Sequence, residues 1–286
     1  MSVSESAAAE LESLEVEPAS RRRDSRVRRL LNGLNRHPKL VRAASLAVTF
    51  AVWEWYGRGV SPLFFSYPTA ILATMPQMVL SGELPKEIAT SAQAFVIGFA
   101  LAIALGVVMG LVTGRYRLVE NLLDSQITAL YSTPTVALIP LLMLWFGLEL
   151  KAKVVIIFLS AFFPIIINTQ GGVRNVSKSL VEIALAEGAN EFQVFTKIIV
   201  PGSLPFMMTG IRLAVGRAVV GMVVAEMFTA ITGLGGAIVY YSNEFATAKL
   251  LVVIIVLALI GVLLTQGVKY FENRLAPWKA TERAAA

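Results

Sequence analysis

The sequence predicts an all-α membrane protein with about six transmembrane helices. Of its 286 residues, 56% are hydrophobic and only 15% are charged, whereas a soluble domain carries about 25% charged residues. The mean hydropathy is correspondingly high, at +0.69. Several segments also reach the length of about 20 apolar residues that crosses a bilayer. Lys and Arg are concentrated in alternate connecting segments, which is the third sign of a polytopic membrane protein.

Six segments are expected to be spans. In chain order they are 40–57, 88–113, 123–147, 152–170, 204–228 and 249–268. The first is the weakest because it contains Arg42 and Glu54. Proline removes a backbone hydrogen bond, so Pro134 and Pro140 are expected to kink the third span and Pro164 the fourth. Between the first two spans, 58–87 is expected to be loop-like, with a short helix starting near Pro68.

The distribution of basic residues predicts the orientation. If the chain starts inside, the inner segments hold 17 of the 25 Lys and Arg and the outer segments hold 3. Positive residues accumulate on the cytoplasmic side, so both termini and the loop 171–204 are expected in the cytoplasm. The predicted domains are a cytoplasmic, disordered acidic-then-basic tail at 1–39, a transmembrane domain at 40–275 and a cytoplasmic tail at 276–286.

Composition also excludes several functions. The chain has no cysteine and a single histidine, His37, which rules out disulfides and a His/Cys metal centre. It has no G-x-x-x-x-G-K-[ST] phosphate loop and cannot hydrolyse ATP by itself. The net charge of +6 is typical of basic cytoplasmic loops rather than of nucleic-acid binding. The basic run 21–29 is either a solvated tail or a contact for anionic membrane lipids.

A stripe of small residues runs along the second span. It consists of Gly98, Ala102, Gly106, Gly110 and Gly114, four residues apart. Such a stripe lets another helix backbone approach closely. It predicts either helix packing within the subunit or a contact between subunits.

The loop 171–204 is too long to be a simple helix connection. Residues 178–187 favour a short helix with Glu182 at its start, and Gly188 permits a turn because glycine tolerates positive φ. Residues 190–195 favour a second short helix on which Phe192 and Phe195 share a face. Two aromatic rings on one face fit a groove on a partner; alternatively, they pack onto the membrane surface.

The same loop carries a recognisable motif. Glu182, Ala184, Gly188, Ile198 and Pro201 match the pattern E-A-A-x3-G-x9-I-x-L-P, while Ile183 and Val200 depart from it. The loop therefore resembles the cytoplasmic loop of ABC-importer permeases, which receives force from an ATPase. The resemblance implies an ATPase-coupling loop made of Glu182, Ala184, Gly188, Phe192, Phe195, Ile198 and Pro201. Pro201 and Pro205 are expected to close this loop before the fifth span.

The resemblance extends over 67–275. In this region the chain is similar to the nitrate/sulfonate/taurine-type branch of these permeases. It rests on Trp145-Phe146-Gly147, Gly210-Ile211-Arg212 and Gly233-Leu234-Gly235, among other segments. It implies the type I ABC importer permease fold, no cofactor and a bacterial inner-membrane location. The implied partners are a second copy, two cytoplasmic ATP-binding subunits and an external substrate-binding protein. The implied solute is small and anionic, such as a sulfonate, taurine or nitrate. The alternative is a secondary transporter or channel, in which internal repeats are common.

Charged and polar residues within spans are candidates for the translocation path because charges are costly there. Arg217 and Glu226 are nine residues apart, hence on opposite helix faces, and cannot pair with each other. Arg217 is expected either to form a structural contact or to attract an anion. The candidate path consists of Arg217, Glu226, Tyr131, Ser132, Thr133 and Thr135. The last four either line the path or satisfy backbone groups freed by Pro134.

Overall fold

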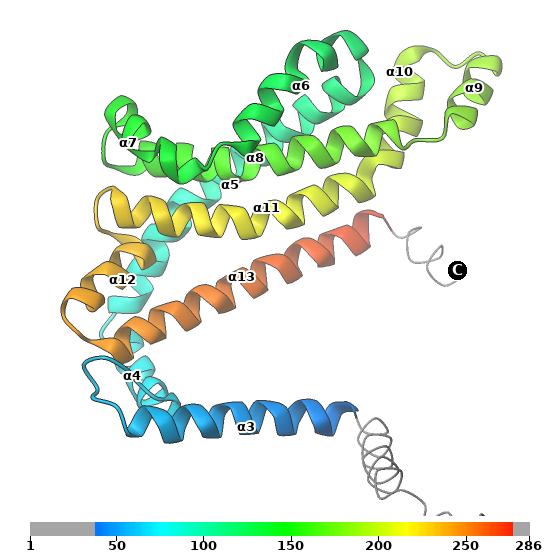
Figure 1. The fold of residues 1–286 in the computed structure, drawn as a ribbon. Helices are drawn as coiled ribbons and strands as arrows, with labels where there is room; N and C mark the ends of the chain where they lie inside the picture. The colour runs from blue at the N-terminus through cyan, green and yellow to red at the C-terminus, as the bar shows by residue number, and fades with distance from the viewer. Residues whose placement is uncertain (1–37, 277–286) are drawn as a thin grey trace, which may run out of the picture. The chain divides into compact units, whose positions relative to one another are not determined.

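The computed structural model describes residues 38–276, and every regular element in that range is helical (Figure 1). Two compact units divide between Gly59 and Val60. The predicted tails lie almost wholly outside the described residues, so their predicted disorder and location stay predictions.

Helix α3 (Pro38–Arg58) belongs to the first unit and occupies the place of the first predicted span. Within it, Arg58 pairs with Glu54 one turn earlier at 2.7 Å, and the rings of Phe50 and Trp53 stack with their centroids 6.1 Å apart. Its polar content keeps α3 out of the set of helices apolar enough to cross a membrane.

The second unit holds the remaining helices. They are α4 (Pro68–Leu80), α5 (Glu83–Arg115), α6 (Arg117–Ser132), α7 (Thr135–Phe146), α8 (Leu150–Arg174), α9 (Lys178–Ala186), α10 (Glu191–Val194), the π-helix η1 (Phe195–Ile199), α11 (Val200–Phe228), α12 (Gly233–Asn243) and α13 (Thr247–Leu275). Within residues 38–276, three helices (α5, α8 and α13) are long and apolar enough to cross a membrane, and two bent pairs raise the number to five.

The kink predicted in the third span is a complete break at Pro134. The segment is two helices, α6 and α7, bent by 99°. Thr133 and Pro134 between them are extended, with ψ of 124° and 116°. The ring of Pro134 disfavours a helical conformation at the residue before it, so the helix stops instead of bending. Pro140, in contrast, lies inside α7 without interrupting it.

The other spans are longer than predicted because the helices continue past the apolar segments into polar residues. Helix α5 starts at Glu83 rather than at 88, and α13 ends at Leu275 rather than at 268. The short helix near Pro68 is confirmed, with this proline in its first turn. Helix α12 is new: the sequence predicted only a connection at 229–247.

Helix α8 is the centre of the second unit and packs between α5 and α11, which run beside it (Figure 1). The small-residue stripe of α5 makes the first of these contacts. A Cβ atom at Gly98 would lie 2.8 Å from the Val154 carbonyl, and one at Gly110 would lie 2.5 Å from Cβ of Thr169. The stripe therefore packs within the chain, which was the first of the two predicted alternatives.

Candidate functional site

The loop between α8 and α11 is a compact helical element. Helix α9 ends at Ala186, and Gly188 just after it has a φ of +85°, as the predicted turn requires. The Gly188 N–H donates to the Leu185 carbonyl at 3.0 Å, and the Ala189 N–H donates to the Ala184 carbonyl at 2.9 Å. These two bonds form a Schellman motif, which closes a helix through a left-handed residue. The motif residues Ala184 and Gly188 thus fix where α9 stops.

The next helix, α10, begins with a capping box. The Asn190 side chain accepts from the Gln193 N–H at 2.8 Å, and the Gln193 side chain accepts from the Asn190 N–H at 2.9 Å. This reciprocal pair satisfies two backbone donors that a helix start leaves free. The position of Phe192 is therefore set by local hydrogen bonds.

The two phenylalanines point to different places, so the prediction that they share an outward face is wrong. Phe192 is 75% exposed. Phe195 packs against the buried cluster formed by Val173, Val194 and Ile199. The backbone from Phe192 to Phe195 is α-helical, so the two side chains differ in direction by about 60°, and the loop core lies on the Phe195 side.

Two more predicted positions need correction. Glu182 lies in the middle of α9, not at its start. Pro201 lies in the first turn of α11 and Pro205 lies inside that helix, so neither closes a loop. Helix α11 continues directly from η1, so Pro201 lies within a continuous helical stretch.

The motif residues also shape a hollow on the loop. Ile198 and Pro201 line a pocket of about 340 Å³ together with Leu180. Leu180, Ile183 and Phe192 are large apolar side chains that the chain itself leaves exposed. We call these three the uncovered apolar residues of the loop.

A second feature lies along the middle of α11, where Arg217 meets Tyr131 of α6. The Arg217 guanidinium donates to the Tyr131 hydroxyl at 3.1 Å, and its carbon lies 5.0 Å from the centre of the tyrosine ring. Arg217 and Thr135 line a pocket of about 290 Å³ between α7, α8 and α11. The structure thus brings together three of the predicted path residues.

Ser132 and Thr133 do not line this pocket. The Thr133 hydroxyl donates to the Ala129 carbonyl at 2.9 Å, and its backbone N–H bonds to the same carbonyl at 3.1 Å. The Thr133 side chain thus bonds back into the end of α6 instead of facing the pocket.

Glu226 occupies a third place, at the start of α12. It is fully buried, and its carboxylate accepts from the Gly235 N–H at 2.8 Å. Beside it, Glu87 accepts from the Gly233 N–H at 2.7 Å, and Ser91 accepts from the Leu234 N–H at 2.8 Å. The first N–H groups of a helix have no partner within it. Here all of the first three have side-chain acceptors, which come from α5 and α11.

The turn before α12 depends on further polar contacts and on glycine. Lys153 of α8 is buried, and its ammonium donates to the Thr232 hydroxyl at 2.6 Å. Gly233 has a φ of +78°, and a Cβ atom at Gly235 would lie 2.8 Å from Cβ of Glu226. The sequence analysis missed Lys153 as well as the two acceptors on α5. The signal that was available is the glycine pair, which marks a close backbone approach.

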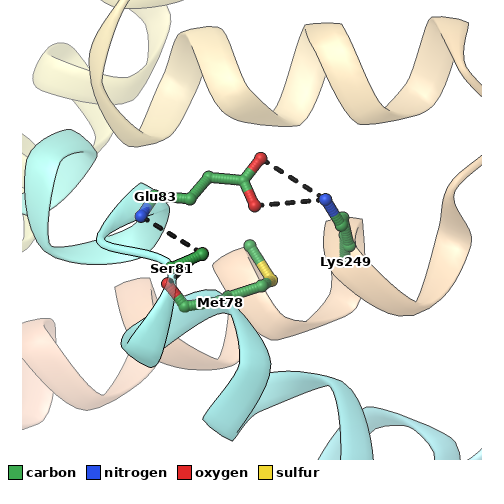
Figure 2. A network of polar contacts seen from close by, with 4 residues as sticks. All are labelled: Met78, Ser81, Glu83 and Lys249. Carbon is green, nitrogen blue, oxygen red and sulfur yellow. Dashed lines mark hydrogen bonds and ion pairs between the residues drawn. The ribbon is translucent and has the colours of Figure 1, made fainter.

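The adjoining corner between α4 and α5 is tied to α13. Figure 2 shows the Lys249 ammonium reaching both carboxylate oxygens of Glu83, the nearer at 3.1 Å. In the same view, the Glu83 N–H donates to the Ser81 hydroxyl at 3.4 Å, which in turn donates to the Met78 carbonyl at 3.2 Å. This end of the unit is therefore fastened by ion pairs and hydrogen bonds from several helices.

Comparison with known proteins identifies the family. Residues 102–277 match the family described as "Binding-protein-dependent transport system inner membrane component". The chain belongs to this family. It is therefore a multi-pass membrane permease subunit of an ABC importer and not an enzyme, because ATP is hydrolysed by a separate subunit.

Relatives match over most of the chain. A protein named as the aliphatic sulfonates transport permease SsuC of Escherichia coli (strain K12) is 37% identical over 235 residues, which are 80% of this chain and 88% of the relative. Its namesake in Bacillus subtilis (strain 168) is 35% identical over 82% of this chain and 85% of the relative. The taurine transport system permease protein TauC of E. coli is 31% identical over 82% of this chain and 88% of the relative.

Solved structures confirm the fold. The inward-facing MetNI methionine ABC transporter matches with a TM-score of 0.55 at 17% identity, over 71% of this chain and 98% of the other. An amino acid ABC transporter with histidines matches with a TM-score of 0.54 at 17% identity, over 70% and 98%. The predicted ABC importer permease fold is thus confirmed.

Proposed function

We propose that this permease imports a small anionic solute and that the loop 182–201 couples it to two cytoplasmic ATP-binding subunits. The proposed assembly also contains a second copy of the chain and an external substrate-binding protein, in a bacterial inner membrane. The observation that carries this proposal is the loop: a motif of ABC-importer permeases lies where large apolar side chains remain uncovered.

The energetics of the loop favour a protein partner. Phe192 is held outward by a capping box, while the neighbouring Phe195 packs inward. Burying one phenylalanine side chain contributes roughly 1.5–3 kcal/mol. A chain that fixes such a ring in an exposed position leaves that free energy available for binding a groove on another protein.

The proposed orientation follows from the basic residues and agrees with this partner. The excess of Lys and Arg in alternate segments favours both termini and the loop on the cytoplasmic side. A cytoplasmic loop would meet ATP-binding subunits there. The domain boundaries 40–275 belong to the same proposal.

The proposed path runs past Arg217. A charged side chain in a membrane helix costs several kcal/mol unless it faces a cavity or a partner. Arg217 is exposed on α11 and lines a pocket, and Leu213 and Val220 on the same helix are exposed too. A second copy of the chain over this face would remove the arginine from lipid and enclose the path. The sulfonate and taurine named for two relatives are both acids, which an arginine would attract.

The mechanism we propose is alternating access. ATP binding closes the ATPase pair, the coupling loop moves with it, and the path opens outward to receive solute from the binding protein. Hydrolysis and release then return the path to the inward-open state.

The test of coupling is Phe192→Asp in the reconstituted importer. A buried charge in the contact should weaken ATPase binding by at least 1.5–3 kcal/mol, roughly the value of the lost phenylalanine burial. Subunit retention on purification and binding-protein-stimulated ATP hydrolysis are the measurements.

Ser242→Asp is the matched control because it places the same charge on an exposed residue of α12, which adjoins the opposite end of α11 from the loop. It should keep the ATPase. If Phe192→Asp retains the ATPase with full stimulation, the loop is not the docking element, and the ATP-binding subunits must contact another part of the permease.

A further inference from the structure

The pocket beside Arg217 combines one charged side chain with mostly apolar walls. It has a volume of about 290 Å³, and Arg217 is the one charged residue among those that line it. Its walls are mostly apolar, with Val136, Ile139, Val220 and Val224 among them. A single cation in an apolar pocket is complementary to a molecule with one anionic group and an apolar body.

The cation is fixed in place. Tyr131 accepts a hydrogen bond from the guanidinium at 3.1 Å and also holds it over the ring at 5.0 Å. Because the tyrosine hydroxyl is neutral, it orients the arginine without neutralising it. No carboxylate lines the pocket, and within residues 38–276 no ion pair of Arg217 is found.

The polar groups nearby do not provide a place for a second charge. Ser160 donates its hydroxyl hydrogen to the Ile156 carbonyl at 2.8 Å, inside its own helix. The nearby acid of α11, Glu226, is buried at the α12 start and bonded to the Gly235 N–H. An ammonium group entering the pocket would lose its water shell, find no carboxylate and meet a like charge on Arg217.

We propose that the permease passes organic monoanions with an apolar body and discriminates against zwitterions that also carry an ammonium group. The proposal rests on the function proposed above and narrows it to a substrate class. It separates two kinds of solute that the names of the relatives leave open, an aliphatic sulfonate and the amino-sulfonate taurine.

The volume of the pocket limits which solutes it can hold. A volume of about 290 Å³ corresponds to roughly ten water molecules in the liquid. Each methylene buried against the apolar walls should favour passage by roughly fourfold. Short alkyl chains are therefore expected to be carried better than an inorganic anion, which has no apolar body to place there.

The experiment compares taurine with propane-1-sulfonate, which has a methyl group in place of the ammonium and is otherwise the same chain. The complete importer with its ATPase and binding protein is reconstituted in vesicles. Uptake of each labelled solute is measured and divided by the fraction of binding protein that carries it, determined separately by calorimetry. We expect at least tenfold faster normalised uptake of propane-1-sulfonate.

Two variants locate the discrimination. Val224→Asp adds a carboxylate to the pocket wall two turns away from Arg217 and should shift the uptake ratio toward taurine by tenfold or more. Val224→Asn is its uncharged match and should leave the ratio within twofold of the parent value. Arg217→Ala should lower uptake of both solutes at least tenfold while the ATPase remains bound.

The outcomes separate the two proposals. Equal or faster normalised uptake of taurine by the parent importer, or an unchanged ratio in Val224→Asp, would overturn the substrate class and leave the importer function intact. An importer that assembles but carries neither solute nor any other anion would count against the proposed function itself.

Discussion

The two ends of α11 are built in opposite ways. At the end that meets α12, the buried carboxylate of Glu226 and two acceptors on α5 bond the free N–H groups of the next helix. At the end that meets the loop, large apolar side chains such as Phe192 remain exposed. One end bonds the free N–H groups of the next helix within the chain, and the other leaves large apolar side chains available to something outside it.

This difference indicates which end of α11 is rigid and which end can move and bind a partner. Buried hydrogen bonds to charged groups are costly to break, so the α12 end should move with α5 and α11 as one body. The loop end has its own caps and its own small core around Val194. The loop can therefore move relative to its neighbours without unfolding, as a coupling element must.

The largest expected effect is at the α12 end. Glu226→Ala should destabilise the permease by about 3 kcal/mol, because the Gly235 N–H loses its acceptor in a buried place. Glu226→Gln keeps an acceptor oxygen and should cost clearly less. Thermal unfolding of the purified permease, followed by tryptophan fluorescence, measures both. If the alanine variant unfolds at the parent temperature, the cap does not hold this end together.

An intermediate effect should separate the inward ring from the outward one. Phe195→Ala should lower the stability of the isolated permease by about 1–3 kcal/mol, since it removes part of the loop core. Phe192→Ala should leave that stability unchanged and weaken ATPase binding instead. Unfolding of the permease alone and subunit retention are the paired measurements. A loss of stability in Phe192→Ala equal to that in Phe195→Ala would remove the contrast between the two rings.

The sequence predicted this molecule well where local chemistry decides. The turn at Gly188, the short helix at Pro68 and the helical spans follow from glycine, proline and apolar length. It failed where distant helices decide. The acceptors Glu87 and Ser91 are more than a hundred residues from the N–H groups that they bond, and nothing in their own neighbourhood shows this.

Other misses have local physical causes that the pattern alone could not resolve. The sequence placed Phe192 and Phe195 on one outward face, but residues three apart on a helix differ in direction by about 60°, and the loop core lies on the Phe195 side. Pro134 could either kink a helix or end it, and the extended Thr133 shows that it ends it. The sequence excluded a pair between Arg217 and Glu226 but left the neighbours of Arg217 open, and only the structure identifies Tyr131 as one of them.

The smallest expected effect tests whether the loop end depends on its own caps. Gly188 has a φ of +85° at the end of α9, and a Cβ atom added there would meet only open space, so Gly188→Ala should cost only the backbone strain, about 1 kcal/mol. Gly171 is also uncrowded but lies inside helix α8, where alanine is favoured over glycine by roughly 0.5–1 kcal/mol. The two substitutions add the same methyl group and should change the unfolding free energy in opposite directions. If Gly188→Ala is as stable as the parent, the Schellman turn is not what positions the coupling loop, and the loop end must be ordered by its core alone.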